Sequence, residues 1–326
     1  MAPPSELIEV LSNAKRPLVV GHVTPDADAI ASMLSLARVL PSQAARVALE
    51  RGKVAQKLRF MVEMGQVPSA DAAEIADADL VAVVDTAGTN RVNVEGKWEA
   101  IAGKFVVNID HHITNPDFGR INWVVDSASS TSELIYRLIT TAGWPLDATT
   151  ASLLYAGIHS DTGGFSLPNT TADALEVAAA LVRGGADIDM LGARLCRSQR
   201  RSEFDLIRVV YHNTRLAADG QIAYSTLSHQ EIVSSGCTAE DIDDQVSIPR
   251  SLSGVRIAML FSEGEPGVIR INFRGENGTP VLPLAQKLGG GGHTFSAGAR
   301  IRDAMERVVE RVLGEATSLL QAPSPE

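Results

Sequence analysis

The tripeptide Asp110-His111-His112 carries the strongest chemical signal in this chain, because a carboxylate and two imidazoles directly follow an apolar segment at residues 106–109. Ionisable groups at the end of a buried strand must be paired, solvated or bound to a metal ion. Each of these side chains alone has an ordinary structural explanation, so their meaning depends on what the rest of the chain supplies.

Other segments supply more side chains of the same kind. Acids and a histidine follow two further apolar strand-like runs at residues 17–21 and 80–84, and another acid ends an apolar helical run. These residues are His22, Asp26, Asp28, Asp85 and Asp161. Imidazole nitrogen mixed with carboxylate oxygen suits Mn²⁺, Fe²⁺, Co²⁺ or Zn²⁺ better than an all-oxygen Mg²⁺ or Ca²⁺ site. We interpret the whole set as one metal site.

An alternation of strands and helices is needed to bring these residues together. Strands are predicted near 17–22, 45–49, 79–84, 104–109 and 121–125, and helices near 5–13, 28–40, 53–64, 129–142 and 147–160. This rhythm predicts an α/β fold with a mostly parallel sheet covered on both faces. Ligands of such sheets lie beyond the carboxyl ends of the strands, where His22, Asp85 and Asp110 are expected.

The remaining pattern indicates a second, smaller α/β domain. Residues 171–215 read as helical, followed by strands near 221–227, 255–261 and 267–273 and helices near 228–234, 281–288 and 302–320. We therefore expect a metal-binding domain over 1–190, a helical linker over 191–215 and a substrate-binding domain over 216–326.

The amino-acid composition limits the kinds of partner that this protein is expected to bind. The formal net charge of −10 argues against a broad basic surface for long duplex nucleic acid, but it leaves room for a short phosphate-bearing ligand at a local positive site. No apolar run approaches the length of a membrane span, and the N-terminus does not read as a signal peptide. The two cysteines show no metal or redox spacing, so a cytoplasmic protein without membrane association is expected.

A glycine run near the C-terminus is the second chemical feature. Gly290, Gly291 and Gly292 belong to this run, and His293 follows it directly. Glycines let backbone amides approach an anion closely, although a flexible turn explains such a run equally well. With Arg274 on a nearby predicted strand, we favour a phosphate or ribose clamp.

In their order and spacing these motifs resemble the DHH phosphoesterase superfamily. The similar segments are residues 21–32, 83–87, 110–112 and 161–165, with 289–298 resembling the associated DHHA1 domain. Length and the single DHHA1 domain are most similar to the group of oligoribonucleases that also act as phosphatases of pAp, 3′-phosphoadenosine 5′-phosphate. One departure is Gly275, where the family usually has serine after the arginine.

The resemblance implies a role for each matching residue. One metal ion would be held by His22, Asp26 and Asp85. A second would be held by Asp28, Asp85, His111 and Asp161, with Asp85 shared. His112 would lie beside the scissile phosphate and Asp110 would orient an imidazole. Arg91 is expected either to pair with a site carboxylate or with substrate, or to be a surface arginine. For Ser129–Glu133 we favour a helix cap, and the resemblance adds a supporting role beside the metals.

The function implied is a phosphoesterase with two Mn²⁺ ions, or Mg²⁺, Co²⁺ or Fe²⁺ in their place. It would hydrolyse short 5′-phosphorylated oligonucleotides to mononucleotides, and pAp to AMP and phosphate. A cyclic or linear dinucleotide phosphodiesterase is the alternative among enzymes, and a nucleotide sensor without catalysis is the alternative outside them. The family resemblance also allows a homodimer.

Overall fold

The chain folds into two compact units, Met1–Ser198 and Gln199–Glu326, in a computed structural model that describes residues 1–50, 54–237 and 242–321. The side chains of residues 243, 244 and 293 are outside this description. The division falls inside the range 191–215, for which the sequence predicts a helical linker.

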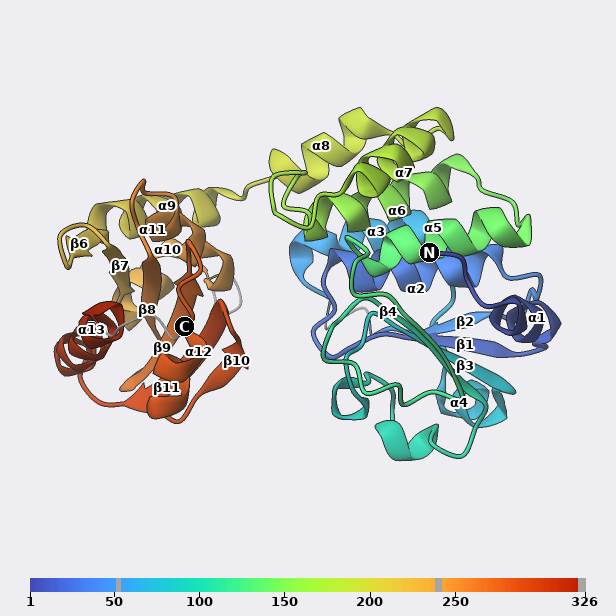
Figure 1. The fold of residues 1–326 in the computed structure, drawn as a ribbon, viewed down its shortest axis with the longest axis horizontal. Helices are drawn as coiled ribbons and strands as arrows, with labels where there is room; N and C mark the ends of the chain where they lie inside the picture. The colour runs from blue at the N-terminus through green and yellow to red at the C-terminus, as the bar shows by residue number, and fades with distance from the viewer. Residues whose placement is uncertain (51–53, 238–241, 322–326) are drawn as a thin grey trace. The chain divides into compact units, whose positions relative to one another are not determined.

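The first unit is built on a parallel sheet of five strands in the order β2-β1-β3-β4-β5 (Figure 1). The strands are β1 (Pro17–Val20), β2 (Arg46–Ala48), β3 (Leu80–Val84), β4 (Val106–Asp110) and β5 (Ile121–Val124). All five match predicted strands in position. Residues on both faces of β3 are buried, which explains its continuous apolar run.

Helices cover both faces of this sheet. They are α1 (Ser5–Asn13), α2 (Ala27–Val39), α3 (Arg59–Gly65), α4 (Ala72–Asp77), α5 (Thr131–Ala142), α6 (Ala148–Asp161), α7 (Ala172–Arg183) and α8 (Ile188–Cys196). Helices α2, α5 and α6 lie on one face and α4 lies on the other (Figure 1). Along β3, Ala82 and Val84 pack into the core beneath α2, whereas Val81 and Val83 pack into the smaller core beside α4.

Two local expectations for the first unit need correction. The helix predicted over 53–64 begins only at Arg59, after the short 3-10 turn Gln56–Leu58. Helix α4 was not predicted; it is a short helix closed by a capping box between Asp71 and Glu74. Further 3-10 turns lie at Thr89–Arg91 and Trp98–Ala100.

The second unit is built on a six-stranded sheet in the order β10-β11-β9-β8-β7-β6, in which only β7 and β8 are parallel. The strands are β6 (Arg215–Ala217), β7 (Ile222–Leu227), β8 (Ile257–Glu265), β9 (Val268–Gly275), β10 (Gly291–His293) and β11 (Ser296–Arg302). Strands β6, β10 and β11 were not predicted. Gly291 and Gly292 of the glycine run pair with β11, which argues against the competing explanation of the run as a flexible turn.

The helices of the second unit cover its apolar surfaces. They are α9 (Arg201–Asn213), α10 (His229–Ser235), α11 (Ser247–Arg250), α12 (Leu282–Lys287) and α13 (Met305–Gln321), with a 3-10 turn at Asp243–Val246. One core lies under α12 and α13 and another under α9 and α10. The predicted α/β class, a mostly parallel sheet followed by a smaller α/β unit, is confirmed. No helix among the described residues is both long and apolar enough to span a membrane.

Candidate metal centre

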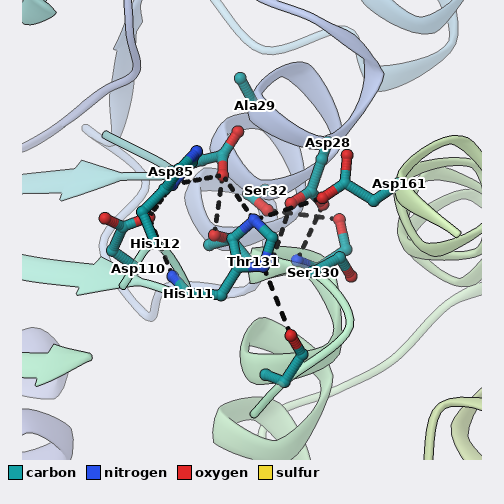
Figure 2. Close-up of polar contacts among 12 residues, drawn as sticks. Asp28, Ala29, Ser32, Asp85, Asp110, His111, His112, Ser130, Thr131 and Asp161 are labelled. Atoms are coloured by element: carbon teal, nitrogen blue, oxygen red, sulfur yellow. Dashed lines mark hydrogen bonds and ion pairs between the residues drawn. The ribbon is translucent and has the colours of Figure 1, made fainter. Parts of the chain in front are cut away.

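The predicted ligands converge beyond the carboxyl ends of three neighbouring strands. His22 follows β1, Asp85 follows β3, and His111 follows β4. Helix α2 brings Asp26 and Asp28 to the same place at its N-terminus, and α6 ends there with Asp161. Figure 2 shows Asp28, Asp85, His111 and Asp161 turned toward one another. All six residues expected as metal ligands therefore lie together.

One cluster consists of His22, Asp26 and Asp85. Nε2 of His22 lies 3.7 Å from Oδ2 of Asp26 and 3.7 Å from Oδ2 of Asp85. The three ligand atoms lie within 4.8 Å of one another, close enough to bind one cation. Asp26 is also the N-cap of α2, because its Oδ1 accepts a hydrogen bond from the amide of Ala29 at 3.0 Å.

The second cluster consists of Asp28, His111 and Asp161. Nε2 of His111 lies 3.2 Å from Oδ2 of Asp161, and the ligand atoms of this group also lie within 4.8 Å of one another. The carboxylate of Asp28 is fully buried. A buried carboxylate that faces a second acid needs a compensating cation or proton.

Asp85 lies between the two clusters. Its Oδ2 faces His22, whereas its Oδ1 lies 3.6 Å from Nε2 of His111. The residue adopts a left-handed backbone conformation with φ of 50°, which is uncommon for a residue other than glycine. Backbone conformations of this kind concentrate at functional sites, and this one occurs at the residue whose two carboxylate oxygens face different clusters.

Backbone carbonyls orient the two imidazoles of the clusters. Nδ1 of His22 donates to the carbonyl of Val23 at 2.7 Å, and Nδ1 of His111 is 3.4 Å from the carbonyl of Ala128. In this arrangement Nε2 of each ring faces the carboxylates and is the nitrogen placed to bind a metal ion. Metal-binding histidines are typically oriented in this way.

His112 is held differently. Its Nδ1 donates to Oδ1 of Asp110 at 2.7 Å and also lies 3.9 Å from Oδ1 of Asp85. The hydrogen bond to Asp110 raises the pKa of His112, and the carboxylate charge adds to this effect against the opposing effect of burial. The result is an imidazole that keeps its proton to higher pH. His112 also forms a third group of possible metal ligands with Asp85 and His111, whose ligand atoms lie within 4.8 Å of one another.

Asn115 supports this pair and was not identified from the sequence. Its Nδ2 donates to Oδ2 of Asp110 at 2.6 Å and lies 2.7 Å from Oδ1 of Asn108. Asp110 is fully buried and both of its oxygens accept hydrogen bonds. The only signal in the sequence was that Asn115 follows His112 closely along the chain, and this spacing does not indicate where the Asn115 side chain points.

The first turn of α5 holds two of the acids. The amides of Thr131 and Ser132 donate to Oδ2 and Oδ1 of Asp28 at 2.7 and 2.9 Å, and the Thr131 hydroxyl donates to Oδ1 of Asp85 at 3.0 Å (Figure 2). Helix N-termini favour negative groups through such amides. The segment is also a helix cap, because Ser130 accepts from the amide of Glu133.

Close packing of α6 against this turn depends on Gly157. A Cβ atom at this position would lie 2.0 Å from Oγ of Ser132 and 2.8 Å from Oδ1 of Asp28. Contacts this short do not occur between real atoms, so only glycine lets α6 approach the buried carboxylate.

The electrostatics of the clusters call for a cation. Burial raises the pKa of Asp85 well above its ordinary value, and the charges of Asp28 and Asp26 raise it further. Burial and the same two charges raise the pKa of Asp161 to about 9. Bound cations would remove both the repulsion and the cost of burial, so the donor set fits metal ions.

Arg91 lies at the edge of the first cluster. Its Nη2 is 3.4 Å from Nδ1 of His22, and its positive charge acts on His112 by lowering the pKa of that imidazole. Whether Arg91 contacts substrate stays a prediction.

The other predicted substrate residues lie in the second unit. Arg274, Gly290, Gly291 and Gly292 line a hollow of about 560 Å³ over strands β9 to β11. Gly290 packs so closely that a Cβ would lie 2.0 Å from the carbonyl of Gly298, whereas Gly291 faces open space. The side chain of His293, also predicted to bind substrate, lies outside the described structure.

The absence of a side chain at Gly275 has a local cause. A Cβ there would lie 1.9 Å from the carbonyl oxygen of Thr279. The loop that returns from β9 therefore occupies the space that a serine would need. Ser296, directly opposite Arg274 on β11, lines the same hollow and offers a hydroxyl there.

Two family models match this chain. The model described as the DHH family, N-terminal domain, matches residues 16–158, and the model described as the DHHA1 domain matches residues 219–322. The first match contains β1 to β5 and most of α6. The second contains the strands that form the hollow.

Similar proteins match nearly the whole chain. The Bifunctional oligoribonuclease and PAP phosphatase NrnA of Bacillus subtilis is 30% identical over 97% of this chain and 98% of its own length. The protein of the same name from Thermus thermophilus is 33% identical, over 95% and 93%. The structure of an exopolyphosphatase-related protein from Bacteroides fragilis has a TM-score of 0.87 at 26% identity and covers 97% of both chains.

Proposed function

The chain belongs to the DHH family and carries a C-terminal DHHA1 domain, and from this membership and the geometry of its acids and imidazoles we propose its function. It is a metal-dependent phosphoesterase that hydrolyses short 5′-phosphorylated oligonucleotides to mononucleotides and pAp to AMP and phosphate. The observation that carries this proposal is the pair of ligand clusters sharing Asp85.

Two Mn²⁺ ions are the proposed cofactors. His22, Asp26 and Asp85 would hold one, and Asp28, Asp85, His111 and Asp161 would hold the other. The mixed nitrogen and oxygen donors support Mn²⁺ over Mg²⁺, with Co²⁺ or Fe²⁺ as substitutes. Such ions supply an activated water near neutral pH and offset negative charge on the phosphoryl oxygens.

Residues outside the proposed ligand sets supply proton donation and substrate binding in this proposal. His112 keeps a proton because Asp110 accepts from its Nδ1, so it can donate through Nε2 to a phosphate or to the leaving oxygen. Arg91 offers a guanidinium beside His22 for a phosphoryl oxygen. In the second unit, Arg274 with Gly290, Gly291, Gly292 and His293 is proposed to bind the part of the substrate remote from the cleaved bond.

The net charge of −10 supports a preference for short substrates over long duplex nucleic acid, because acidic residues outnumber basic ones. A homodimer and a cytoplasmic location stay predictions.

One experiment tests the proposal. Metal-stripped protein is supplied with Mn²⁺ and assayed side by side on pAp, a 5′-phosphorylated dinucleotide, cyclic di-AMP and pyrophosphate. We expect turnover of pAp and the dinucleotide, and loss of both activities in Asp85→Asn. Turnover of cyclic di-AMP alone would favour a cyclic dinucleotide phosphodiesterase. Binding of pAp without product would identify a sensor and overturn the proposal.

A further inference from the structure

Helix α7 is apolar on two faces. Its inner face packs on α6, and the buried residues of that face are Ala174, Val177, Ala178 and Leu181. Its other apolar residues are exposed, and these are Ala172, Leu175, Ala179 and Val182. Helices with apolar residues all round are normally covered on both sides, so the exposed residues of α7 indicate a further partner.

The four exposed residues have the spacing of a helix-packing seam. From Ala172 to Val182 they follow one another in steps of three, four and three residues, which keeps them in one exposed stripe along α7. Leu175 is 50% exposed and Val182 is 45% exposed. Ala179 lies between them and is small, so the backbone of a second helix can approach closely there. Within the first unit, α7 belongs to the outer layer of helices, on the side of α5 and α6 remote from the sheet (Figure 1).

The charges beside the exposed stripe are complementary to those of the same helix in the reverse direction. Glu176 and Arg183 are seven residues apart, so they lie along one edge of the stripe, the acid in its first half and the base at its end. Both are exposed, and neither side chain has a hydrogen bond or ion pair among the residues that the structure describes. In an antiparallel pair of these helices, each Glu176 faces the Arg183 end of the other copy. A parallel pair would instead place like charges together.

We propose that the exposed stripe of α7 is the contact between two copies of this chain, packed antiparallel about a two-fold axis. Such an interface uses the same surface on both copies and must therefore be complementary to itself. The apolar stripe and the reversed charges at its edge meet this requirement. The inference concerns assembly and does not depend on the reaction that the protein catalyses. Because a pair of 12-residue helices is smaller than the interfaces of tight complexes, we expect a weak dimer with a dissociation constant of about 10 µM.

Charge reversal tests the proposal through the oligomeric state. Sedimentation velocity of the full chain, over about 1 to 200 µM, measures the dissociation constant of the dimer. Glu176→Arg or Arg183→Glu alone places like charges opposite each other at both symmetric contacts and should raise this constant about tenfold or more. The double variant Glu176→Arg/Arg183→Glu exchanges the two charges and should restore the wild-type value. Glu9→Arg is the matched control, because it reverses an exposed charge on α1, and it should leave the constant unchanged.

Rescue by the double variant is a result that misfolding of a single variant would not imitate. Leu175→Gln removes an apolar side chain from the stripe and should also weaken the dimer. At concentrations where the wild type is monomeric, its melting temperature should match that of the wild type. A wild type that stays monomeric throughout, or a dimer that none of these variants weakens, would overturn the proposal. So would a monomer whose melting temperature falls in Glu176→Arg and stays low in the double variant, because the second unit of the same chain would then cover the stripe.

Discussion

The hydroxyl of Thr131 donates a 3.0 Å hydrogen bond to Oδ1 of Asp85, and both residues are buried. Oδ1 is the oxygen that faces His111, whereas Oδ2 faces His22. The hydrogen bond therefore fixes the rotation of the one carboxylate that both clusters share. Thr131 is a positioning residue, since it acts through Asp85.

Replacing Thr131 with valine should weaken metal binding. The valine keeps the shape but removes the donor, and such supporting contacts typically contribute about 10- to 100-fold in metal affinity or activity. Mn²⁺ titrations of activity, with calorimetric binding, measure the loss. Thr131→Ser restores the hydroxyl and should recover most of the affinity; a valine variant that binds Mn²⁺ like the wild type would show that the contact is incidental.

The pair formed by Asp110 and His112 predicts a pH effect. Asp110 raises the pKa of His112, so an acid role for His112 persists to higher pH and activity falls as pH rises through that pKa. Asp110→Asn removes the carboxylate charge and should move this alkaline fall in kcat to lower pH. Asp117→Asn is the matched control, because it removes an exposed carboxylate from the same loop and leaves Asp110 on His112. An unchanged alkaline limb in Asp110→Asn would refute the acid role.

Metal binding should release protons near neutral pH. The pKa of Asp161 is raised to about 9 by burial and by the charges of Asp28 and Asp26, so metal-free protein holds a proton there at neutral pH. Affinity for Mn²⁺ should therefore increase with pH up to about 9. Calorimetry in two buffers of different ionisation enthalpy counts the protons, and Asp161→Asn should release about one fewer.

The same raised pKa values predict how metal-free protein responds to pH. A carboxyl whose pKa is higher in the folded state contributes stability below the pKa of the unfolded chain, and this contribution is lost as pH rises through the folded value. In the presence of a chelator, the contribution of Asp161 to the melting temperature should thus decline from about pH 4 toward about pH 9. Asp161→Asn in chelator should show a shallower decline than the wild type. Saturating Mn²⁺ should flatten the wild-type dependence, because it replaces the protons.

Restoring serine at position 275 should destabilise the second unit. Its Cβ would collide with the carbonyl of Thr279, and forcing atoms into a packed site costs about 1–3 kcal/mol. Denaturant unfolding of Gly275→Ser measures this cost. Gly291→Ala is the control, since a Cβ there meets nothing within 4 Å. Equal stability of Gly275→Ser and wild type would mean that the returning loop yields easily.

The acids and imidazoles of both clusters could be predicted because a parallel sheet gathers the ends of its strands on one edge. His22 and Asp85 needed only that rule, whereas the choice of His111 over Asp110 as a ligand came from the family resemblance. The roles of Thr131 and Asn115 could not be predicted in this way, because their contacts with Asp85 and Asp110 depend on how a helix and a loop fold in space. A helix-capping segment such as Ser130 and Thr131 has the same sequence pattern whether or not it also faces a buried acid.

In the second unit, strand β11 was difficult to predict from the sequence. Strand β11 is rich in glycine and alanine, which weakens any sign of a strand, and its pairing with β9 is set by register. The opposition of Arg274 and Ser296 follows from that register alone. Their separation along the chain carries no hint of it.

Two of the donors that hold Asp28 are main-chain amides, so no single substitution at Thr131 or Ser132, other than proline, can delete them. The position of these two amides is set by the residue at which α5 begins. A one-residue insertion or deletion between β5 and α5 would move both amides at once, and the carboxylate of Asp28 would lose both hydrogen bonds. In this segment, chain length is therefore under tighter constraint than side-chain identity.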